Sequence, residues 1–168
     1  MKRARRPRAA PLAAMRLLAL DVDGVLTDGR LEYGAVGERG KSFHARDGYG
    51  IKALLAAGVE VAVISGRKSP AVQRRCEELG IRHVRLGVGE KGAALAELLA
   101  ALQLEPGQCT CVGDDEPDIP MMRLAGLAVA VADAHPVAAA AAHRRTRQRG
   151  GDGAVREVCD WLLAARSR

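Results

Sequence analysis

The chain has 168 residues, a length typical of a single domain with a sizeable hydrophobic core. Hydrophobic residues make up 48% of it but aromatic residues only 2%, so Ala, Val and Leu must fill that core. The formal net charge is +6, but five positive charges fall within the first eight residues and leave the rest nearly neutral. A nucleic-acid partner is therefore not expected for the domain.

Residues 1–15 are predicted to form a basic, disordered arm, and residues 16–168 a single domain. The arm has no aromatic residues to stack on bases, so we interpret it as solvated; binding to a phosphate backbone is the alternative. Its apolar part is interrupted by Pro11 and Arg16 and continues into the first strand, unlike an export signal.

No stretch approaches the roughly 18 apolar residues of a membrane span. Four scattered cysteines favour a reduced, cytoplasmic enzyme over a zinc site or a disulfide framework.

Buried strands alternate with helices along the chain. Strands are expected over 17–20, 59–64, 83–86, 109–112 and 127–131, and a β-hairpin over about 30–44. The first helix is expected between Asp47, which caps it, and Gly58, which closes it. Further helices are expected over 69–79, 90–102, 117–124 and 134–142, and a last one from the glycines at 150–153 to about 166. This alternation predicts an α/β fold with a doubly wound, Rossmann-like parallel sheet. The sequence lacks a GxGxxG after a strand and a P-loop lysine, so a dinucleotide or ATP site is not expected.

The first strand ends in two carboxylates, Asp21 and Asp23, within LLALDVDGVLTDG. Ligands of open α/β sheets bind just outside the carboxyl ends of the strands. Side chains alternate along an extended chain, so the two carboxylates can share a direction, and close carboxylates favour a cation between them. A turn that simply follows a strand is the alternative, because Asp and Gly are ordinary turn residues.

Further polar residues stand at strand ends or helix starts: Ser65, Lys91, Asp114 and Asp115. Each has a separate explanation as a turn residue, a solvated side chain or a helix N-terminus. Together they suit phosphoryl transfer. Acids can hold Mg²⁺, one Asp can attack phosphorus, a second acid can move the proton, and a hydroxyl and an ammonium can hold phosphate oxygens.

At these residues the chain resembles the haloacid dehalogenase-like phosphatases: DVDGVLTDG, ISGR, Lys91 and VGDDEPD match their four motifs in order. The resemblance implies Asp21 as nucleophile and metal ligand and Asp23 as general acid/base that also gives its backbone carbonyl to Mg²⁺. It implies that Asp114 completes the metal site with support from Asp115, and that Ser65 and Lys91 bind phosphate.

A narrower resemblance, over nearly all of residues 16–165, is to the 3-deoxy-D-manno-octulosonate 8-phosphate phosphatases, small members of that superfamily without a cap domain. KSFHARDGYGIKALLAAG, ISGRKSPAVQRRCEELGI, VAVADAHP and GGDGAVREVCDWLL carry it. It implies Mg²⁺-dependent hydrolysis of that sugar acid phosphate in lipopolysaccharide precursor synthesis. It also implies a homotetramer built by the hairpin and a glycine segment, 150–153, that reaches toward an active site. The implied substrate contacts are Asp23, His44, Ala45, Arg46, Asp47, Gly48, Lys52, Arg67, Arg75, Lys91 and Asp115.

Some of these contacts have structural alternatives. Arg75 can be a surface residue of its helix, Asp47 a helix cap, Lys52 a solvated side chain and His44 part of the hairpin packing. The remaining histidines fit no triad or ligand spacing and are interpreted as structural.

Two other functions stay open. The first is a phosphatase of a nine-carbon, sialic-type acid phosphate. Its second motif tends to read TGE, whereas this chain has SGR and carries Glu78 where a lysine would follow. The second is a non-catalytic regulatory or assembly domain, which would be expected to lose at least one of Asp21, Asp23, Lys91 and Asp114; all four are present.

Overall fold

The structure is a computed structural model that describes residues 9–167. Six parallel strands form one sheet in the order β5-β4-β1-β6-β7-β8. They are β1 (Leu17–Leu20), β4 (Glu60–Ser65), β5 (His83–Leu86), β6 (Cys109–Gly113), β7 (Leu127–Ala130) and β8 (Arg144–Arg145). Two further strands, β2 (Glu32–Gly34) and β3 (Gly37–Gly40), form an antiparallel hairpin.

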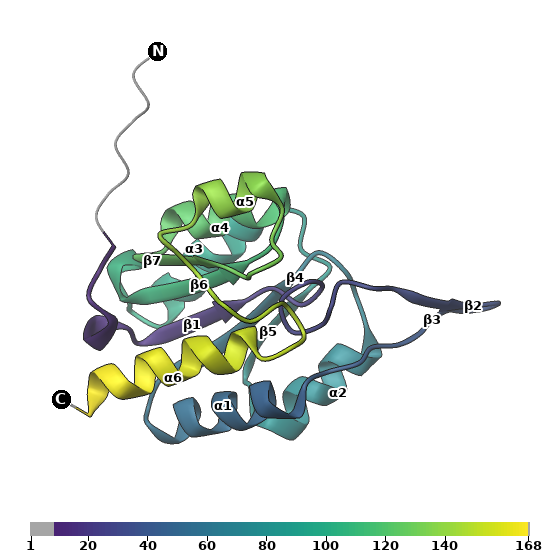
Figure 1. Cartoon of the computed structure of the whole chain (residues 1–168), viewed down its shortest axis with the longest axis horizontal. Helices are drawn as coiled ribbons and strands as arrows, with labels where there is room; N and C mark the ends of the chain where they lie inside the picture. The colour runs from purple at the N-terminus through teal and green to yellow at the C-terminus, as the bar shows by residue number, and fades with distance from the viewer. Residues whose placement is uncertain (1–8, 168) are drawn as a thin grey trace, which may run out of the picture.

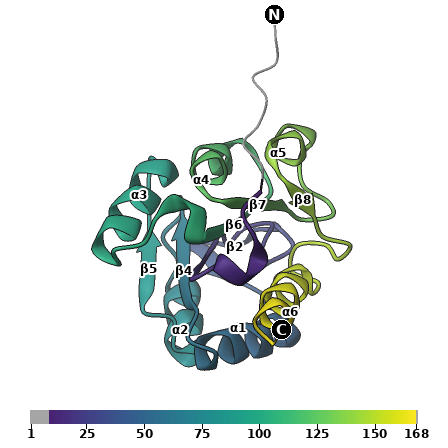
Figure 2. The same ribbon diagram turned by 90° about the vertical axis from the view of Figure 1, so that its left-hand side faces the viewer.

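Among residues 9–167, six α-helices surround the sheet (Figure 1). They are α1 (Ala45–Ala56), α2 (Pro70–Leu79), α3 (Lys91–Ala101), α4 (Ile119–Leu124), α5 (Pro136–Ala141) and α6 (Ala154–Arg166). Helices α1, α2 and α6 lie on one face, and α3, α4 and α5 on the other (Figure 2). The predicted doubly wound α/β fold is confirmed, with the hairpin as a small insertion and no cap domain within the described residues.

The central strand β1 positions the candidate site. All four of its residues are fully buried between β4 and β6. The order of the strands reverses at β1, because the chain builds β4 and β5 on one side of it and β6 to β8 on the other. Asp21, Ser65 and Asp114 stand where β1, β4 and β6 end, so the parallel register brings them to one edge, the usual place for a ligand in such sheets.

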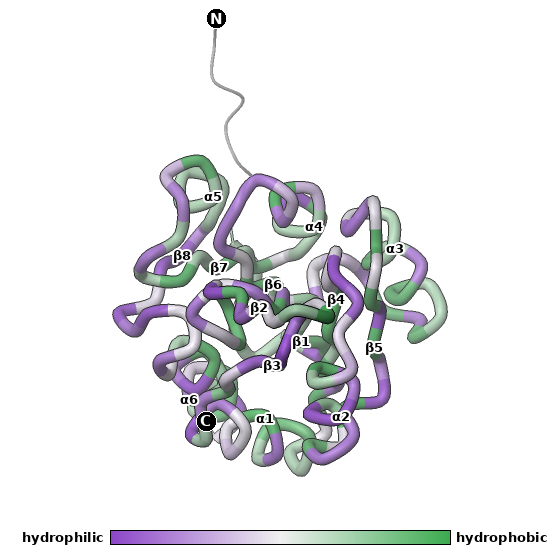
Figure 3. The backbone as a smooth tube through the Cα atoms, turned by 90° about the vertical axis from the view of Figure 1, so that its right-hand side faces the viewer, coloured by the Kyte–Doolittle hydropathy of each residue, from purple (hydrophilic) through white to green (hydrophobic). Residues whose placement is uncertain are grey.

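Burial follows the hydrophobic pattern. The tube view from the hairpin side shows hydrophobic residues gathered in strands and helices, and hydrophilic residues in many of the connecting segments (Figure 3). The four cysteines are free and buried, which confirms their interpretation as core residues. In the part of the chain that the structure describes, no helix is long and apolar enough to cross a bilayer.

The hairpin projects beyond the edge of the sheet where the candidate site lies (Figure 1). It exposes apolar side chains: Leu31, just before β2, is 42% exposed, Tyr33 is 59% exposed, and Val36 at its turn is fully exposed. Exposed apolar residues gathered on one projecting element are typical of a surface that meets a partner.

Part of the N-terminal arm does not match its prediction. Residues 9–15 are ordered: Leu12–Ala14 form a 3₁₀ turn, Met15 is fully buried and the backbone N–H of Ala10 donates to the carbonyl of Gly126. The apolar side chains of this stretch pack on the domain, which outweighs the entropy of disorder. The basic residues of the arm, Lys2, Arg3, Arg5, Arg6 and Arg8, lie outside the described residues.

Two local features differ from the sequence prediction. The short edge strand β8 was not predicted, because two exposed arginines carry no apolar pattern. The N-cap of α1 is His44, whose side chain accepts a hydrogen bond from the backbone N–H of Arg46, and not Asp47. The predicted cap of α2 is confirmed: Gly80 closes the helix at a φ of 79°.

Candidate active site

The loop that follows β1 is a compact turn. The carbonyl of Val22 accepts backbone hydrogen bonds from Val25, Leu26 and Thr27, and Gly24 adopts a φ of 88°. A Cβ at Gly24 would lie 2.0 Å from Oδ2 of Asp114, so glycine is required by the neighbouring carboxylate as well as by its backbone angle. The turn leaves Asp21 buried and Asp23 partly exposed at the site.

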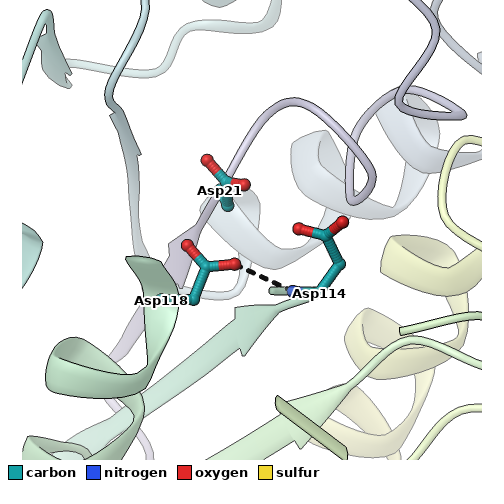
Figure 4. A group of neighbouring side chains, drawn as sticks. All are labelled: Asp21, Asp114 and Asp118. Carbon is teal, nitrogen blue, oxygen red and sulfur yellow. Dashed lines mark hydrogen bonds between the residues drawn. The ribbon is translucent and has the colours of Figure 1, made fainter. Parts of the chain in front are cut away.

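Three carboxylates converge beside this turn: Asp21, Asp114 and Asp118 (Figure 4). One oxygen from each can be chosen so that all three lie within 4.8 Å of one another. The sequence interpretation did not assign a role to Asp118, although it is the last acid of GDDEPD. The spacing in the sequence could have indicated this role, because Asp118 is the third residue after Asp115. One turn of 3₁₀ helix, Glu116–Asp118, has three residues and therefore brings the side chain of Asp118 back beside Asp115.

Lys91 links two members of this cluster. It is the first residue of α3 and is buried, and its Nζ lies 2.7 Å from Oδ1 of Asp21 and 2.7 Å from Oδ1 of Asp118. Burial lowers the pKa of Lys91, but the two carboxylates beside it raise that pKa by more, so the ammonium stays charged.

The carboxylates themselves repel one another. Burial, reinforced by the charge of Asp118, raises the pKa of Asp21 to about 6, while Lys91 opposes that rise. Burial, together with the charges of Asp118 and Asp21, raises the pKa of Asp114 to about 8. One lysine does not neutralise three clustered acids, two of them buried and Asp114 half-buried, so the cluster favours an additional cation.

The donors present fit a hard divalent cation such as Mg²⁺. Both oxygens of Asp118 are engaged, Oδ1 by Lys91 and Oδ2 by the backbone N–H groups of Asp114 and Asp115 at 2.8 Å and 3.3 Å. The carboxylate of Asp114, by contrast, faces the carboxylates of Asp21 and Asp118, one oxygen of each lying within 4.8 Å of the others. Clustered carboxylate oxygens are the ligands that Mg²⁺ prefers.

Ser65 and Arg67 line the same cavity as the three carboxylates. Ser65 ends β4 and is buried, and its Oγ accepts a hydrogen bond from the backbone N–H of Arg67 at 3.3 Å. The guanidinium of Arg67 lies 3.9 Å from Oδ2 of Asp23 and donates to the hydroxyl of Tyr33 at 2.6 Å. Arg67 therefore joins the hairpin to the acid cluster.

These residues surround a cavity of about 310 Å³. Its lining contains seven residues that the sequence analysis assigned to the site: Asp21, Asp23, Ser65, Arg67, Lys91, Asp114 and Asp115. The structure therefore brings the catalytic, metal and phosphate candidates into one place.

The other implied substrate contacts lie elsewhere in the chain. Arg46 is exposed and lines a different hollow of about 780 Å³, among the arginines of β8 and the start of α6. Arg75 lines a hollow of about 470 Å³ with Lys41 and Phe43, and it is paired with Glu78 at 3.0 Å. His44, Ala45 and Lys52 are on or beside α1, away from the residues that line the acid cavity.

Two residues of α1 have packing roles in this structure. Asp47 is buried, and its Oδ1 accepts a hydrogen bond from the backbone N–H of Arg156 in the first turn of α6. Gly48 lies under Arg75, where a Cβ would lie 2.4 Å from the guanidinium. Asp47 thus caps α6, in place of the helix-capping role in α1 that the sequence predicted.

Lys41 is a residue of the site that the sequence analysis missed. It follows β3, and its Nζ lies 2.6 Å from Oδ1 of Asp23 and 3.2 Å from Oε2 of Glu38. A hydrogen bond from the Ser69 hydroxyl, with Lys41 and Arg67 nearby, lowers the pKa of Glu38. A lysine in a glycine-rich hairpin gives no sequence signal, because only the fold of the hairpin brings it to Asp23.

Comparison with known proteins places the chain in a family. A family model described as haloacid dehalogenase-like hydrolase matches residues 87–158. The chain is 49% identical to the 3-deoxy-D-manno-octulosonate 8-phosphate phosphatase of Yersinia pestis over 93% of its own length and 83% of the relative. It is 51% identical to the phosphatase of that name from Escherichia coli K12, over 92% of its length and 82% of the relative.

Solved structures agree with these sequence matches. A phosphatase of the same name from Moraxella catarrhalis, solved with magnesium, phosphate and a KDO molecule, superposes with a TM-score of 0.90 at 40% identity, covering 93% of this chain and 90% of that one. The cobalt-bound form of the Haemophilus influenzae phosphatase gives 0.91 at 44% identity, with 93% and 91% covered. The chain belongs to the 3-deoxy-D-manno-octulosonate 8-phosphate phosphatase family of the haloacid dehalogenase-like hydrolases.

Proposed function

We propose that this chain is a Mg²⁺-dependent phosphatase that hydrolyses 3-deoxy-D-manno-octulosonate 8-phosphate to the free sugar acid and phosphate. The observation that carries the proposal is the single cavity shared by Asp21, Asp23, Ser65, Lys91 and Asp114, in a chain about half identical to phosphatases of that name. The proposal includes a place in lipopolysaccharide precursor synthesis, which follows from the relatives' substrate.

The substrate's phosphate would enter between Ser65 and Lys91. The hydroxyl and the ammonium are donors for anionic oxygens, and both groups line the cavity. Lys91 also donates to Oδ1 of Asp21 at 2.7 Å, which fixes the orientation of the nucleophilic carboxylate. In the first step, the bond from Asp21 to phosphorus forms as the bond from phosphorus to the sugar oxygen breaks.

Asp23 would move the proton. In its acid form it donates a proton to the departing sugar oxygen, and as a carboxylate it then accepts a proton from the water that attacks the aspartyl-phosphate. That water forms the new bond to phosphorus and releases Asp21. The partial exposure of Asp23, with a side chain 21% exposed against 8% for Asp21, suits a group that must meet both a leaving group and a water.

Mg²⁺ would be held by carboxylate oxygens of Asp21 and Asp114 and by the backbone carbonyl of Asp23. When bound, it would offset the repulsion between the anionic ester and the nucleophile. Asp118 would orient this site from behind, since its oxygens already bind Lys91 and the backbone of Asp114. Asp115, at the rim of the cavity, would support it.

The sugar acid would extend from the cavity toward arginines. Arg67 lies at the cavity itself, and the hollow lined by Arg75 adjoins it through Lys41, which contacts Asp23. Arg is well shaped to grip a carboxylate with two parallel hydrogen bonds. The contacts proposed for His44, Ala45, Arg46 and Lys52 lie outside this cavity, so in this proposal they serve a neighbouring subunit, while Gly48 packs beneath Arg75.

The proposed assembly is a homotetramer built through the hairpin. The exposed Leu31, Tyr33 and Val36 support it, because burying such apolar area against other copies is favourable. We also propose a cytoplasmic location, which the four free, buried cysteines support.

A panel of phosphate esters tests the function. The expected result is phosphate release with the highest kcat/KM for the octulosonate 8-phosphate, lower values for nine-carbon sugar acid 9-phosphates and hexose phosphates, and loss of activity when EDTA removes Mg²⁺. Equal kcat/KM across the panel would contradict the substrate assignment. A preference for the nine-carbon acids would assign the alternative substrate, and no phosphate release from any ester would favour the non-catalytic alternative.

A further inference from the structure

Lys41 is a buried cation placed against the proton-transferring residue. Its side chain is only 2% exposed and lies between two carboxylates, Asp23 at 2.6 Å and Glu38 at 3.2 Å. Removing an ammonium from water costs several kcal/mol unless close carboxylates compensate it. A lysine kept so far from solvent on a projecting hairpin therefore requires both partners to stay in place.

The other end of this contact is anchored. Glu38 accepts a hydrogen bond from the hydroxyl of Ser69, the N-cap residue of α2, at 2.7 Å, and lies 3.5 Å from the guanidinium of Arg67. The chain of contacts Ser69–Glu38–Lys41–Asp23 therefore connects the start of α2 to the turn after β1 through the base of the hairpin. Glu38 and Lys41 come from the hairpin, whereas Ser69 and Asp23 come from the body of the domain.

Lys41 contacts only one side of the Asp23 carboxylate. It binds Oδ1, while Oδ2 has as its nearest cation the more exposed Arg67, at 3.9 Å. Oδ2 is therefore the oxygen left for a leaving group or a water in the cavity. A carboxylate with one oxygen fixed has lost most of its rotational freedom, which is what proton transfer at a defined point needs.

We propose that Lys41 is a positioning residue that fixes the carboxylate of Asp23 for proton transfer. Proton transfer then depends on the hairpin being packed against the start of α2 and the turn after β1. This rests on the proposed function, in which Asp23 protonates the departing alkoxide. Lys41 itself touches neither the phosphate nor the nucleophile in this scheme. Its effect should appear only where the leaving group needs a proton.

The test compares two substrates that differ in that need. The sugar acid phosphate releases an alkoxide, whereas p-nitrophenyl phosphate releases a stable phenolate. Because kcat/KM reports the steps up to formation of the aspartyl-phosphate, Lys41→Met should lower it on the order of 10²-fold for the alkyl ester and less than about 5-fold for the aryl ester. The ratio of the two values is independent of any inactive fraction, since that fraction lowers both equally.

A matched control comes from β3, the strand that Lys41 follows. Arg39→Met removes an exposed cation of β3 that, among the described residues, has no carboxylate partner, and should leave both kcat/KM values unchanged. Lys41→Gln offers a second, polar replacement and should give the same split. In an Asp23→Asn background, Lys41→Met should cost less than about 3-fold more on the alkyl ester, because its effect passes through Asp23.

Three results would overturn the proposal. These are an equal loss on both esters, no loss on either, or a full further loss in the Asp23→Asn background. Each can occur while the wild-type protein hydrolyses the alkyl ester, so failure of this proposal is distinguishable from failure of the proposed function. A wild-type protein that released phosphate from neither ester would overturn both.

Discussion

Gly150 packs directly on the backbone of Gly24. A Cβ on Gly150 would lie 1.7 Å from the carbonyl oxygen of Gly24, and the N–H of the next residue, Gly151, donates to the carbonyl of Val25 at 3.0 Å. The glycine segment before α6 therefore supports the turn that carries Asp23. In this structure, it contacts the turn of its own chain.

Gly150→Ala should disturb stability and activity together. The added methyl group has no space and must displace the turn after β1, so the free energy of unfolding should fall by about 1–3 kcal/mol and kcat/KM should fall with it. Urea unfolding and kinetics measure the two effects. Gly107→Ala is the control, because a Cβ there meets nothing within 4 Å. Equal stability of the two variants would contradict the close packing at Gly150.

Asp21→Asn should abolish turnover without unfolding the protein. The amide cannot attack phosphorus, so kcat should fall on the order of 10³-fold or more, and no phosphorylated enzyme should accumulate. Rapid quenching followed by mass spectrometry measures the covalent intermediate. Asp118→Asn is a useful comparison, since Asp118 acts through Lys91 and should still permit the covalent step. Full activity of Asp21→Asn would refute the mechanism.

Mg²⁺ should stabilise the protein more at higher pH. Asp21 and Asp114 have folded-state pKa values of about 6 and about 8, both raised from 3.8, so the protonated forms are favoured by folding. Their contribution to stability is full below pH 3.8 and is lost as the pH rises through those folded-state values. A bound cation removes this penalty and displaces protons, so the Mg²⁺-induced rise in Tm should grow from pH 6 to pH 8. A smaller rise at pH 8 than at pH 6 would contradict this assignment.

Val36→Glu should disrupt the proposed tetramer. Val36 is fully exposed at the turn of the hairpin, and a charge there would be buried in any contact that the hairpin makes with other copies. Sedimentation velocity should show a smaller species than the wild type. Val137→Glu, at an exposed apolar residue of α5, should leave the assembly unchanged. Identical sedimentation of Val36→Glu and wild type would contradict the proposal that the hairpin forms the contacts between subunits.

Asp47→Ala separates packing from substrate binding. The Asp47 carboxylate is buried and caps α6 through the N–H of Arg156 at 2.8 Å, so its loss should lower the free energy of unfolding by about 1–2 kcal/mol. KM for the sugar acid phosphate should stay within about 2-fold of wild type, because this predicted contact lies in the interface between α1 and α6. A large rise in KM with unchanged stability would restore Asp47 to the substrate site.

The sequence by itself determined the chemistry and most of the scaffold. Asp21, Ser65, Lys91 and Asp114 each follow a recognisable strand or begin a helix, and a parallel sheet must bring such positions to one edge. The combination of carboxylates, a hydroxyl and an ammonium then indicates phosphoryl transfer, because the chemical group that each side chain carries can be read directly from the sequence. The ordering of residues 9–15 and the short strand β8 were not predicted, since their burial or pairing depends on neighbours distant in sequence.

Only the tertiary structure decided which residues support those groups. Lys41 reaches Asp23 because the segment after β3 returns to the turn that follows β1, and Asp47 caps α6 because two helices pack together. Asp118 is engaged from both sides by Lys91 and the backbone of Asp114, which no spacing alone specifies. Such contacts arise from the packing of whole elements. The need for glycine at positions 24 and 150 is therefore apparent only in the folded structure, where the turn after β1 meets the segment before the last helix.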